Sequence, residues 1–204
     1  MTIRRFALAA TLAAGTVLMV GCGDDTTAKS LSGAEVYPPP AVGALSLPDA
    51  SADDSDFTFK AADGHLLVVY FGYTSCPDVC PTTLAEVKKA LKQVGDDASK
   101  VDVAMATIDP DRDSGEILTG YVQSFIPGAH ALRTEDPAAL QAVADAFGVS
   151  YSVTKAADGT VEVSHTGNLY VVDPSGNVVL TWLFGIPADG IATDIEILFD
   201  RSAS

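Results

Sequence analysis

An unbroken apolar run with two cysteines close behind it restricts the fold of this chain more than any other feature. Residues 66–71 are all aliphatic or aromatic, and they lie between Gly64 and Gly72. A short run of this kind is typical of a strand that is buried on both faces of a sheet. Cys76 and Cys80 follow it, and Pro81 comes next. We therefore expect a core strand that leads directly into a site with two thiols.

The remainder of the chain alternates between helical and extended patterns. Apolar residues at helical spacing after Pro81 predict a first helix, the run 101–108 predicts a strand, and residues 114–125 predict a second helix. Asp136-Pro137 opens a third helix with an N-cap followed by proline. Strands are predicted at 161–163, 169–172 and 178–183, and a last helix at 187–199. This order predicts an α/β protein of thioredoxin-like fold, in which helices flank a mixed central sheet and a β-hairpin is inserted.

The cysteine pair lies where the first core strand ends and its helix begins, which is where thioredoxin-like folds carry their active thiols. A helix N-terminus presents unpaired N–H groups and a partial positive charge, and both lower the pKa of a nearby thiol. We expect Cys80, immediately before Pro81, to be the N-cap residue of this helix. Cys76 should then lie in the loop above it.

The N-terminal residues predict export and a lipid anchor. Arg4 and Arg5 precede an uncharged apolar stretch, 6–20, which is the layout of a signal peptide over residues 1–21. The tetrapeptide Met19-Val20-Gly21-Cys22 resembles a bacterial lipoprotein box, so Cys22 is expected to carry lipid and to tether the protein outside the cell membrane. Residues 22–40 are small and polar and end in three prolines, which predicts a flexible tether. The domain itself should span residues 41–204.

The charge and the cysteine count narrow the function. The chain has 27 acidic and 12 basic residues and a net charge of −15, which excludes nucleic acid as a partner. A cation, or a protein with a basic surface, fits this charge better. Of the three cysteines, Cys22 is expected to be lipidated, which leaves Cys76 and Cys80 for a redox couple or a metal site.

Three intervening residues leave room for an ion between the two sulfurs. Two thiolates suit Cu(I) or Zn(II), but a structural zinc site takes four protein ligands, whereas three suffice for Cu(I). A third ligand must come from the three histidines. His65 lies at the remote end of the core strand and His130 between a helix and a strand, so both are expected on the surface. His165 lies in a polar stretch between two apolar strands, where its imidazole can project toward a site.

Three motifs in this order and spacing resemble the Sco/SenC family. They are Gly72-Tyr73-Thr74-Ser75-Cys76-Pro77-Asp78-Val79-Cys80-Pro81-Thr82, Thr107-Ile108-Asp109-Pro110-Asp111-Arg112-Asp113, and Ser164-His165 followed by Leu169-Tyr170-Val171-Val172-Asp173-Pro174 and Gly176. The resemblance implies a copper-binding metallochaperone that helps to assemble the CuA centre of cytochrome c oxidase. It implies that Cys76, Cys80 and His165 bind one copper ion, as Cu(I), Cu(II) or both. The implied partners are oxidase subunit II with its CuA domain, a copper donor protein and a thiol reductant.

The acidic residues near these motifs have two interpretations. Asp109 and Asp111 could lie in a solvated loop after a strand, with Asp113 or Ser114 capping the next helix, or they could assist Cu(II) binding or partner recognition. Asp78, between the cysteines, would oppose thiolate charge, so capping or docking is expected rather than ligation.

The same residues also fit other functions. The main alternative to a metallochaperone is an enzyme, a thiol-disulfide reductase that keeps the CuA cysteines of the oxidase subunit reduced. A peroxidase related to peroxiredoxins shares the fold but needs an activating arginine, and the sequence assigns none. A redox or copper sensor would use the same residues.

Overall fold

The computed structural model describes residues 30–202. The predicted signal peptide, Cys22 and the first part of the tether lie outside these residues. In the part of the chain that the structure describes, no helix has both the length and the apolar character needed to cross a membrane. The elements are β1 Ser46–Asp49, η1 Ala50–Ala52, β2 Ser55–Thr58, β3 Leu66–Gly72, α1 Val79–Val94, η2 Gly95–Lys100, β4 Val101–Thr107, α2 Gly115–Phe125, β5 His130–Leu132, α3 Pro137–Phe147, β6 Tyr151–Lys155, β7 Val161–His165, β8 Leu169–Val172, β9 Val178–Trp182 and α4 Ala188–Ser202.

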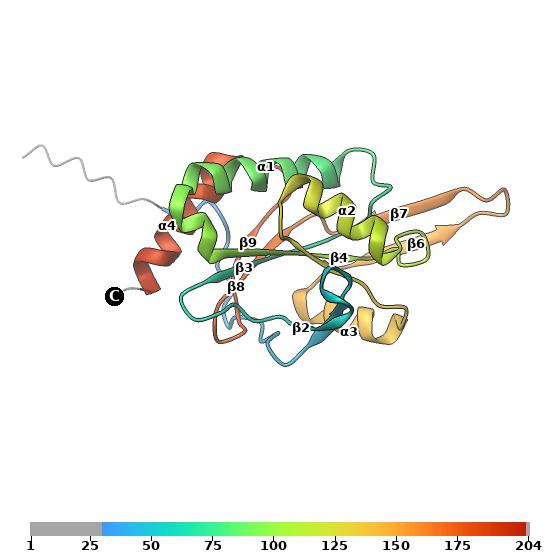
Figure 1. The fold of residues 1–204 in the computed structure, drawn as a ribbon, viewed down its shortest axis with the longest axis horizontal. Coiled ribbons are helices and arrows are strands. Elements are labelled where there is room, and N and C mark those ends of the chain that lie inside the picture. The colour runs from blue at the N-terminus through green and yellow to red at the C-terminus, as the bar shows by residue number, and fades with distance from the viewer. Residues whose placement is uncertain (1–29, 203–204) are drawn as a thin grey trace, which may run out of the picture.

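A seven-stranded mixed sheet forms the centre of the domain, with the strand order β2-β1-β5-β4-β3-β8-β9. Strands β3, β4 and β5 are parallel, and the other pairs are antiparallel. Helices α1, α2 and α4 cover one face, and α3 lies against the other (Figure 1). Because β3 is central and covered on both sides, all seven of its residues are buried. The thioredoxin-like fold and the core strand predicted from residues 66–71 are thus confirmed.

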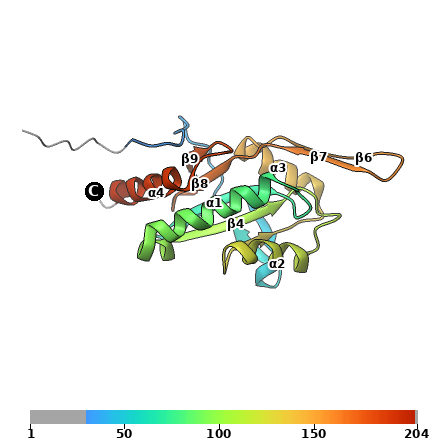
Figure 2. The same ribbon diagram turned by 90° about the horizontal axis from the view of Figure 1, so that it is seen from above.

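Strands β6 and β7 form a separate antiparallel hairpin between α3 and β8, and of its two strands the sequence predicted only the second, from residues 161–163. It projects away from the sheet and the helices (Figure 2). Tyr151 at its start pairs with His165 at its end, and the ring of His165 contacts that of Tyr70 on β3, so the base of the hairpin lies against the domain. His165 was expected in a loop, but it is the last residue of β7.

Two helices begin as their N-caps predict, whereas α1 does not. The side chains of Ser114 and Asp136 accept backbone hydrogen bonds at the starts of α2 and α3. In α1 the N-cap is Asp78, and the prediction that Cys80 caps this helix is wrong. The backbone carbonyl of Asp78 already accepts a hydrogen bond from Thr82 N–H at 3.1 Å, so helical bonding starts before Cys80. Cys80 therefore lies within the first turn of the helix.

The chain that precedes β1 packs along the edge strand β9. The backbone N–H groups of Ser32 and Gly33 donate to the carboxylate of Asp194, each at 2.8 Å, and Ala34 forms a β-bridge with Thr181. The Trp182 indole donates to the same carboxylate, which is fully buried. Residues 32–34, which we expected in a flexible tether, therefore belong to the packed domain. They also cover part of an open sheet edge.

Candidate metal and redox site

Three segments of the fold bring two thiols and one imidazole together. Cys76 lies in the loop between β3 and α1, Cys80 in the first turn of α1, and His165 at the end of β7. One ligand atom from each lies within 4.8 Å of the other two. Both cysteines are free thiols. The core strand, its helix and the base of the hairpin thus meet at one point.

Cys80 is fully buried against β3, where Gly72 has no side chain to occupy the same space. A Cβ atom added at Gly72 would lie 3.0 Å from the Cys80 sulfur and 2.7 Å from the Tyr70 ring, so no larger residue fits there without displacement. Tyr70 lies two residues earlier on the strand, hence on the same face. Its hydroxyl donates a hydrogen bond to Cys80 Sγ at 3.3 Å.

His165 has one ring nitrogen bound to the backbone and the other turned toward the thiols. Nδ1 lies 3.0 Å from the carbonyl oxygen of Thr166, which can only accept, so Nδ1 carries the proton of the neutral ring. Nε2 then has a free electron pair, and it lies 3.8 Å from Cys80 Sγ. Burial lowers the pKa of His165, although its bond to Thr166 opposes the shift. The imidazole is therefore held in the tautomer that binds a metal through Nε2.

The rings of two tyrosines fix the orientation of this imidazole. Tyr73 and Tyr70 meet the His165 ring edge to face, with centroids 5.9 and 6.2 Å away. Edge-to-face contacts of aromatic rings are favourable at such separations. His165 is thus restrained by packing as well as by its hydrogen bond.

The two thiols have opposite electrostatic environments. Burial raises the pKa of the Cys80 thiol to about 12, and the hydrogen bond from Tyr70 offsets only part of this. Burial also acts on Cys76, but hydrogen bonds outweigh it, chiefly that from the Cys80 backbone N–H at 3.3 Å, and they lower the pKa of Cys76. The first turn of α1 therefore stabilises a thiolate at Cys76, while Cys80 is held as a thiol.

The donor set and its spacing fit a soft metal ion. With bond lengths of about 2.3 Å to sulfur and about 2.0 Å to nitrogen, a sulfur and a nitrogen at 120° around one ion would be about 3.7 Å apart. The distance between Cys80 Sγ and His165 Nε2 is 3.8 Å. Two thiolates and an imidazole are also the ligands that favour Cu(I) over hard cations. The residues present therefore suit a soft ion bound by three ligands.

The site opens into a groove of about 370 Å³, lined by Tyr73, Cys76, Val163, His165 and Phe184, among others. Cys76 is 9% exposed and Cys80 is not exposed at all, so Cys76 is the sulfur nearer to solvent. Phe184, from the loop between β9 and α4, is half exposed beside the groove. A partner molecule can therefore reach the site from this side.

The three acidic candidates do not join this cluster. Asp78 is exposed and its carboxylate accepts from Thr82 Oγ1 at 3.4 Å. Asp109 is buried and paired with Arg112, and Asp111 is exposed. Within residues 30–202, Cys76, Cys80 and His165 form the single group of three or more potential ligands that could hold a metal ion.

The other two histidines are half-buried and each contacts a carboxylate. His65 Nδ1 lies 3.3 Å from Asp102, and His130 Nδ1 lies 2.6 Å from Asp49. Neither is a member of the ligand group.

Sequence reasoning missed the residues that surround the ligands, namely Tyr70, Gly72, Tyr73 and Phe184. The alternation of side chains along β3 would have placed Tyr70 and Gly72 on one face. No local pattern indicates that Tyr73 or Phe184 lies beside His165, because these contacts join segments far apart in the chain.

A thioredoxin-like fold that presents two thiols and a histidine within 4.8 Å defines a class of metal-binding and thiol-redox domains. Within that class, residues 46–200 match the SCO1/SenC family, and the chain belongs to this family.

Relatives and solved structures agree with this membership. An SCO2-like protein of Rickettsia prowazekii is 31% identical over 130 residues, which cover 63% of this chain and 63% of the relative. The mitochondrial protein SCO1 homolog 1 of Arabidopsis thaliana is 33% identical over 129 residues, 62% of this chain and 38% of the relative. The chain thus spans less than two thirds of the length of these relatives.

Two solved structures share the fold over most of their length. ScoI of Bradyrhizobium japonicum with copper bound is 31% identical, with a TM-score of 0.64 over 75% of this chain and 96% of that one. Apo Sco1 of Thermus thermophilus is 27% identical, with a TM-score of 0.73 over 84% of this chain and 99% of that one.

Proposed function

We propose that this protein is a copper chaperone that binds one copper ion through Cys76, Cys80 and His165 and delivers it to the CuA site of cytochrome c oxidase subunit II. The observation that carries this proposal is the convergence of two sulfurs and one unprotonated imidazole nitrogen within 4.8 Å. Membership of the SCO1/SenC family, in which a relative has been solved with copper bound, supports copper as the ion.

The redox state of the two cysteines controls whether the site exists. Copper binds to thiolates, so loading of the reduced pair displaces the proton that Cys80 holds at neutral pH. Oxidation joins the two sulfurs in a disulfide and removes two of the three ligands. Because compartments outside the cytoplasm favour disulfides, a thiol reductant has to keep the pair reduced there.

The position of the site suits transfer to another protein. Cys76 and His165 both line the groove, while Cys80 lies beneath it and is fully buried. A thiolate of the partner can thus approach the ion from the Cys76 side and exchange with one ligand at a time. A separate copper donor protein would load the site by the same route.

We further propose that the mature protein begins at a lipidated Cys22 and is anchored in the cell membrane, with the domain on the extracytoplasmic side. The apolar stretch 6–20 and the Met19 to Cys22 tetrapeptide support this. The anchor would hold the domain close to a membrane-bound oxidase.

A second candidate function is that of a thiol-disulfide reductase for the CuA cysteines. The contrast between the two thiols favours it, because a lowered pKa at Cys76 is typical of an attacking thiolate and the buried Cys80 could resolve the mixed disulfide. This reaction needs both cysteines, but it does not need the imidazole.

His165 separates the two functions. A strain that lacks this gene would be complemented with the wild type, with His165→Ala, or with His65→Ala, which removes a histidine outside the ligand group. The chaperone predicts that His165→Ala fails to restore cytochrome c oxidase activity, that added copper rescues the strain, and that His65→Ala behaves as wild type. Full restoration by His165→Ala would contradict copper delivery and support the reductase.

A further inference from the structure

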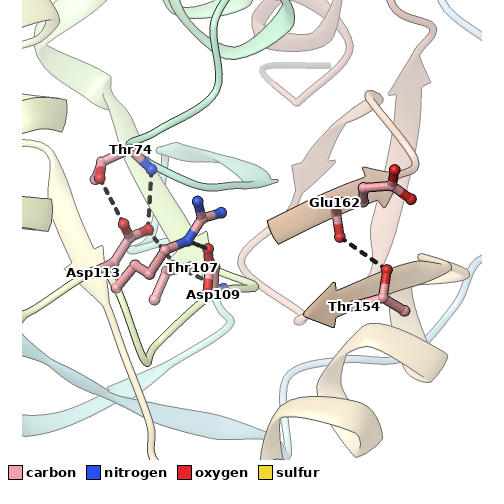
Figure 3. A network of polar contacts seen from close by, with 7 residues as sticks. Thr74, Thr107, Asp109, Asp113, Thr154 and Glu162 are labelled. Carbon is pink, nitrogen blue, oxygen red and sulfur yellow. Dashed lines mark hydrogen bonds and ion pairs between the residues drawn. The ribbon is translucent and has the colours of Figure 1, made fainter. Parts of the chain in front are cut away.

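A buried carboxylate beside the site has no part in the function proposed above. Asp113 ends the acidic loop between β4 and α2, and its side chain is fully buried. Its two oxygens accept three hydrogen bonds, from Thr74 N–H at 3.0 Å, Thr74 Oγ1 at 2.6 Å and Thr107 Oγ1 at 2.6 Å (Figure 3). Thr107 is the last residue of β4, so Asp113 joins the end of a core strand to the loop that holds Thr74.

That loop also carries Cys76. It spans residues 73–78 between β3 and α1, and Thr74 lies two residues before Cys76. The Cys76 N–H donates to the Tyr73 carbonyl at 3.3 Å, which closes a tight turn with Thr74 and Ser75 at its centre. Both the backbone and the side chain of Thr74 are held by Asp113. The position of Cys76 therefore depends on this carboxylate.

The same acidic loop restrains the loop of Cys76 at a second point. The Arg112 guanidinium lies over the Tyr73 ring, 5.6 Å from its centroid, and Arg112 is itself paired with Asp109. Tyr73 in turn packs against His165. The acidic loop, which we considered as an aid to Cu(II) binding, thus contacts residues next to two of the ligands. It contributes no member to the ligand group itself.

Formation of a disulfide requires movement of the part that Asp113 holds. Cys80 is fully buried in α1, whereas Cys76 lies in a loop, so closure to a sulfur–sulfur bond of about 2.05 Å moves Cys76 toward Cys80. The hydrogen bonds at Thr74 oppose such a movement, because they fix the loop in the geometry of the two free thiols.

We propose that Asp113 is a positioning residue that holds Cys76 in the dithiol geometry and thereby shifts the equilibrium of the pair away from the disulfide. In a glutathione buffer, Cys76 and Cys80 each lose a proton and together give two electrons to oxidised glutathione. The sulfur–sulfur bond of glutathione breaks to leave two thiols as the Cys76–Cys80 bond forms. This inference deepens the proposed function, since the dithiol is the state that would bind copper, but the equilibrium itself needs no metal.

The principal variant is Asp113→Asn, which replaces one acceptor oxygen with an amide that points hydrogens at the donors of Thr74 or Thr107. We expect the equilibrium constant for disulfide formation to rise about tenfold, which is a reduction potential about 30 mV more negative for this two-electron couple. Thr74→Val, which keeps the N–H but lacks the hydroxyl, should shift it in the same direction by a smaller factor. Thr74→Ser retains the hydroxyl and should behave as wild type.

Asp194→Asn is the matched control. Asp194 is also fully buried and accepts three hydrogen bonds, from Ser32, Gly33 and Trp182, but none of them comes from the loop of Cys76. This variant should unfold at a lower denaturant concentration, yet its dithiol–disulfide equilibrium should stay within twofold of wild type. The comparison separates positioning of Cys76 from a general loss of stability.

All variants would be made in the full chain with Cys22→Ser, kept in mild detergent, so that Cys76 and Cys80 are its only thiols. Equilibration in glutathione buffers, followed by acid quench, alkylation and mass spectrometry, gives the fraction in each state. An Asp113→Asn equilibrium within twofold of wild type, or an equal shift in Asp194→Asn, overturns the proposal. If Asp113→Asn does not fold, the contrast between Thr74→Val and Thr74→Ser decides it, and equal values for the two overturn it.

The result is independent of copper binding. A wild type that binds no copper would contradict the proposed function and leave the redox comparison valid. Conversely, a wild type that binds copper, together with an unshifted Asp113→Asn equilibrium, would retain the proposed function and remove the role of Asp113.

Discussion

Replacement of Tyr70 by phenylalanine tests how the core strand supports the metal ligands. The change removes the hydroxyl that donates to Cys80 Sγ at 3.3 Å and leaves the buried ring in place. In the free protein Cys80 is a thiol, because burial raises its pKa to about 12, whereas the metal-bound state needs the thiolate. Hydrogen bonds to charged acceptors contribute about 1.5–3 kcal/mol and those to neutral ones about 0.5–1.5 kcal/mol. Tyr70→Phe should therefore weaken Cu(I) binding by about 1 kcal/mol, or roughly fivefold.

Tyr121→Phe provides a control with the same chemical change. The Tyr121 hydroxyl is buried and has no hydrogen-bond partner in the part of the chain that the structure describes. Its removal leaves no donor or acceptor unpaired, so Cu(I) affinity should stay within twofold of wild type and stability should not fall. Affinities would be measured by competition with a Cu(I) chelator under anaerobic conditions, at one pH, for the reduced proteins.

The reasoning fails if Tyr70→Phe binds Cu(I) as tightly as wild type, since the hydroxyl would then favour thiol and thiolate equally. It also fails if Tyr121→Phe weakens binding as much as Tyr70→Phe does. In that case the effect would come from general packing near α1 and not from the bond to Cys80.

Three further predictions concern the thiols, the imidazole and the packed N-terminal segment. Because the pKa of Cys76 is lowered and that of Cys80 raised, a limiting amount of iodoacetamide at pH 7 should alkylate Cys76 first, and peptide mapping that shows Cys80 modified first would refute this. Burial lowers the pKa of His165, so the folded state binds the imidazole proton more weakly than the unfolded state does. The metal-free protein should therefore lose stability as pH falls below 6.5. Denaturant unfolding should show a smaller loss of stability over this pH range in His165→Ala. Asp194→Ala leaves three donors unpaired and should lower the unfolding free energy by about 3 kcal/mol. It should also expose residues 32–34 to protease cleavage. Resistance of these residues to cleavage in the variant would contradict their packing against Asp194.

The parts of the fold that the sequence predicts are those with strong local patterns. The unbroken apolar run became β3, and the caps Ser114 and Asp136 begin helices as expected. Strands β1 and β2 were missed, and β5 was anticipated only as a strand next to His130 without bounds, because all three are three or four residues long and too short for a clear alternation. Strand β6 was missed because it lies on a projecting hairpin and is mostly exposed, so no apolar face marks it.

In the candidate site, the ligands could be predicted from the sequence, whereas the contacts that restrain them could not. Its two sulfurs are four residues apart, so the strand–helix junction places them together, and the third ligand came from a choice among three histidines and a family resemblance. The restraints on these ligands could not be predicted. Thr74 and Asp113 are 39 residues apart, and Ser32 and Asp194 are 162 apart, and such pairs meet only after the sheet has formed.

The position of Cys80 shows how a local rule fails. The residue before a proline often caps a helix, and that favoured Cys80 as the N-cap. The helix begins earlier because Asp78 accepts the first helical hydrogen bond. Pro81 is still tolerated, since the first turn of a helix has N–H groups without intrahelical partners.

An anaerobic Cu(I) titration of the reduced protein tests the central claim most directly. Wild type should bind one ion, and Cys76→Ser, Cys80→Ser and His165→Ala should each lose affinity by at least tenfold, while His130→Ala, which lies outside the ligand group, should match wild type. Near-stoichiometric binding by Cys76→Ser or Cys80→Ser at wild-type affinity would contradict a copper site built from these three residues.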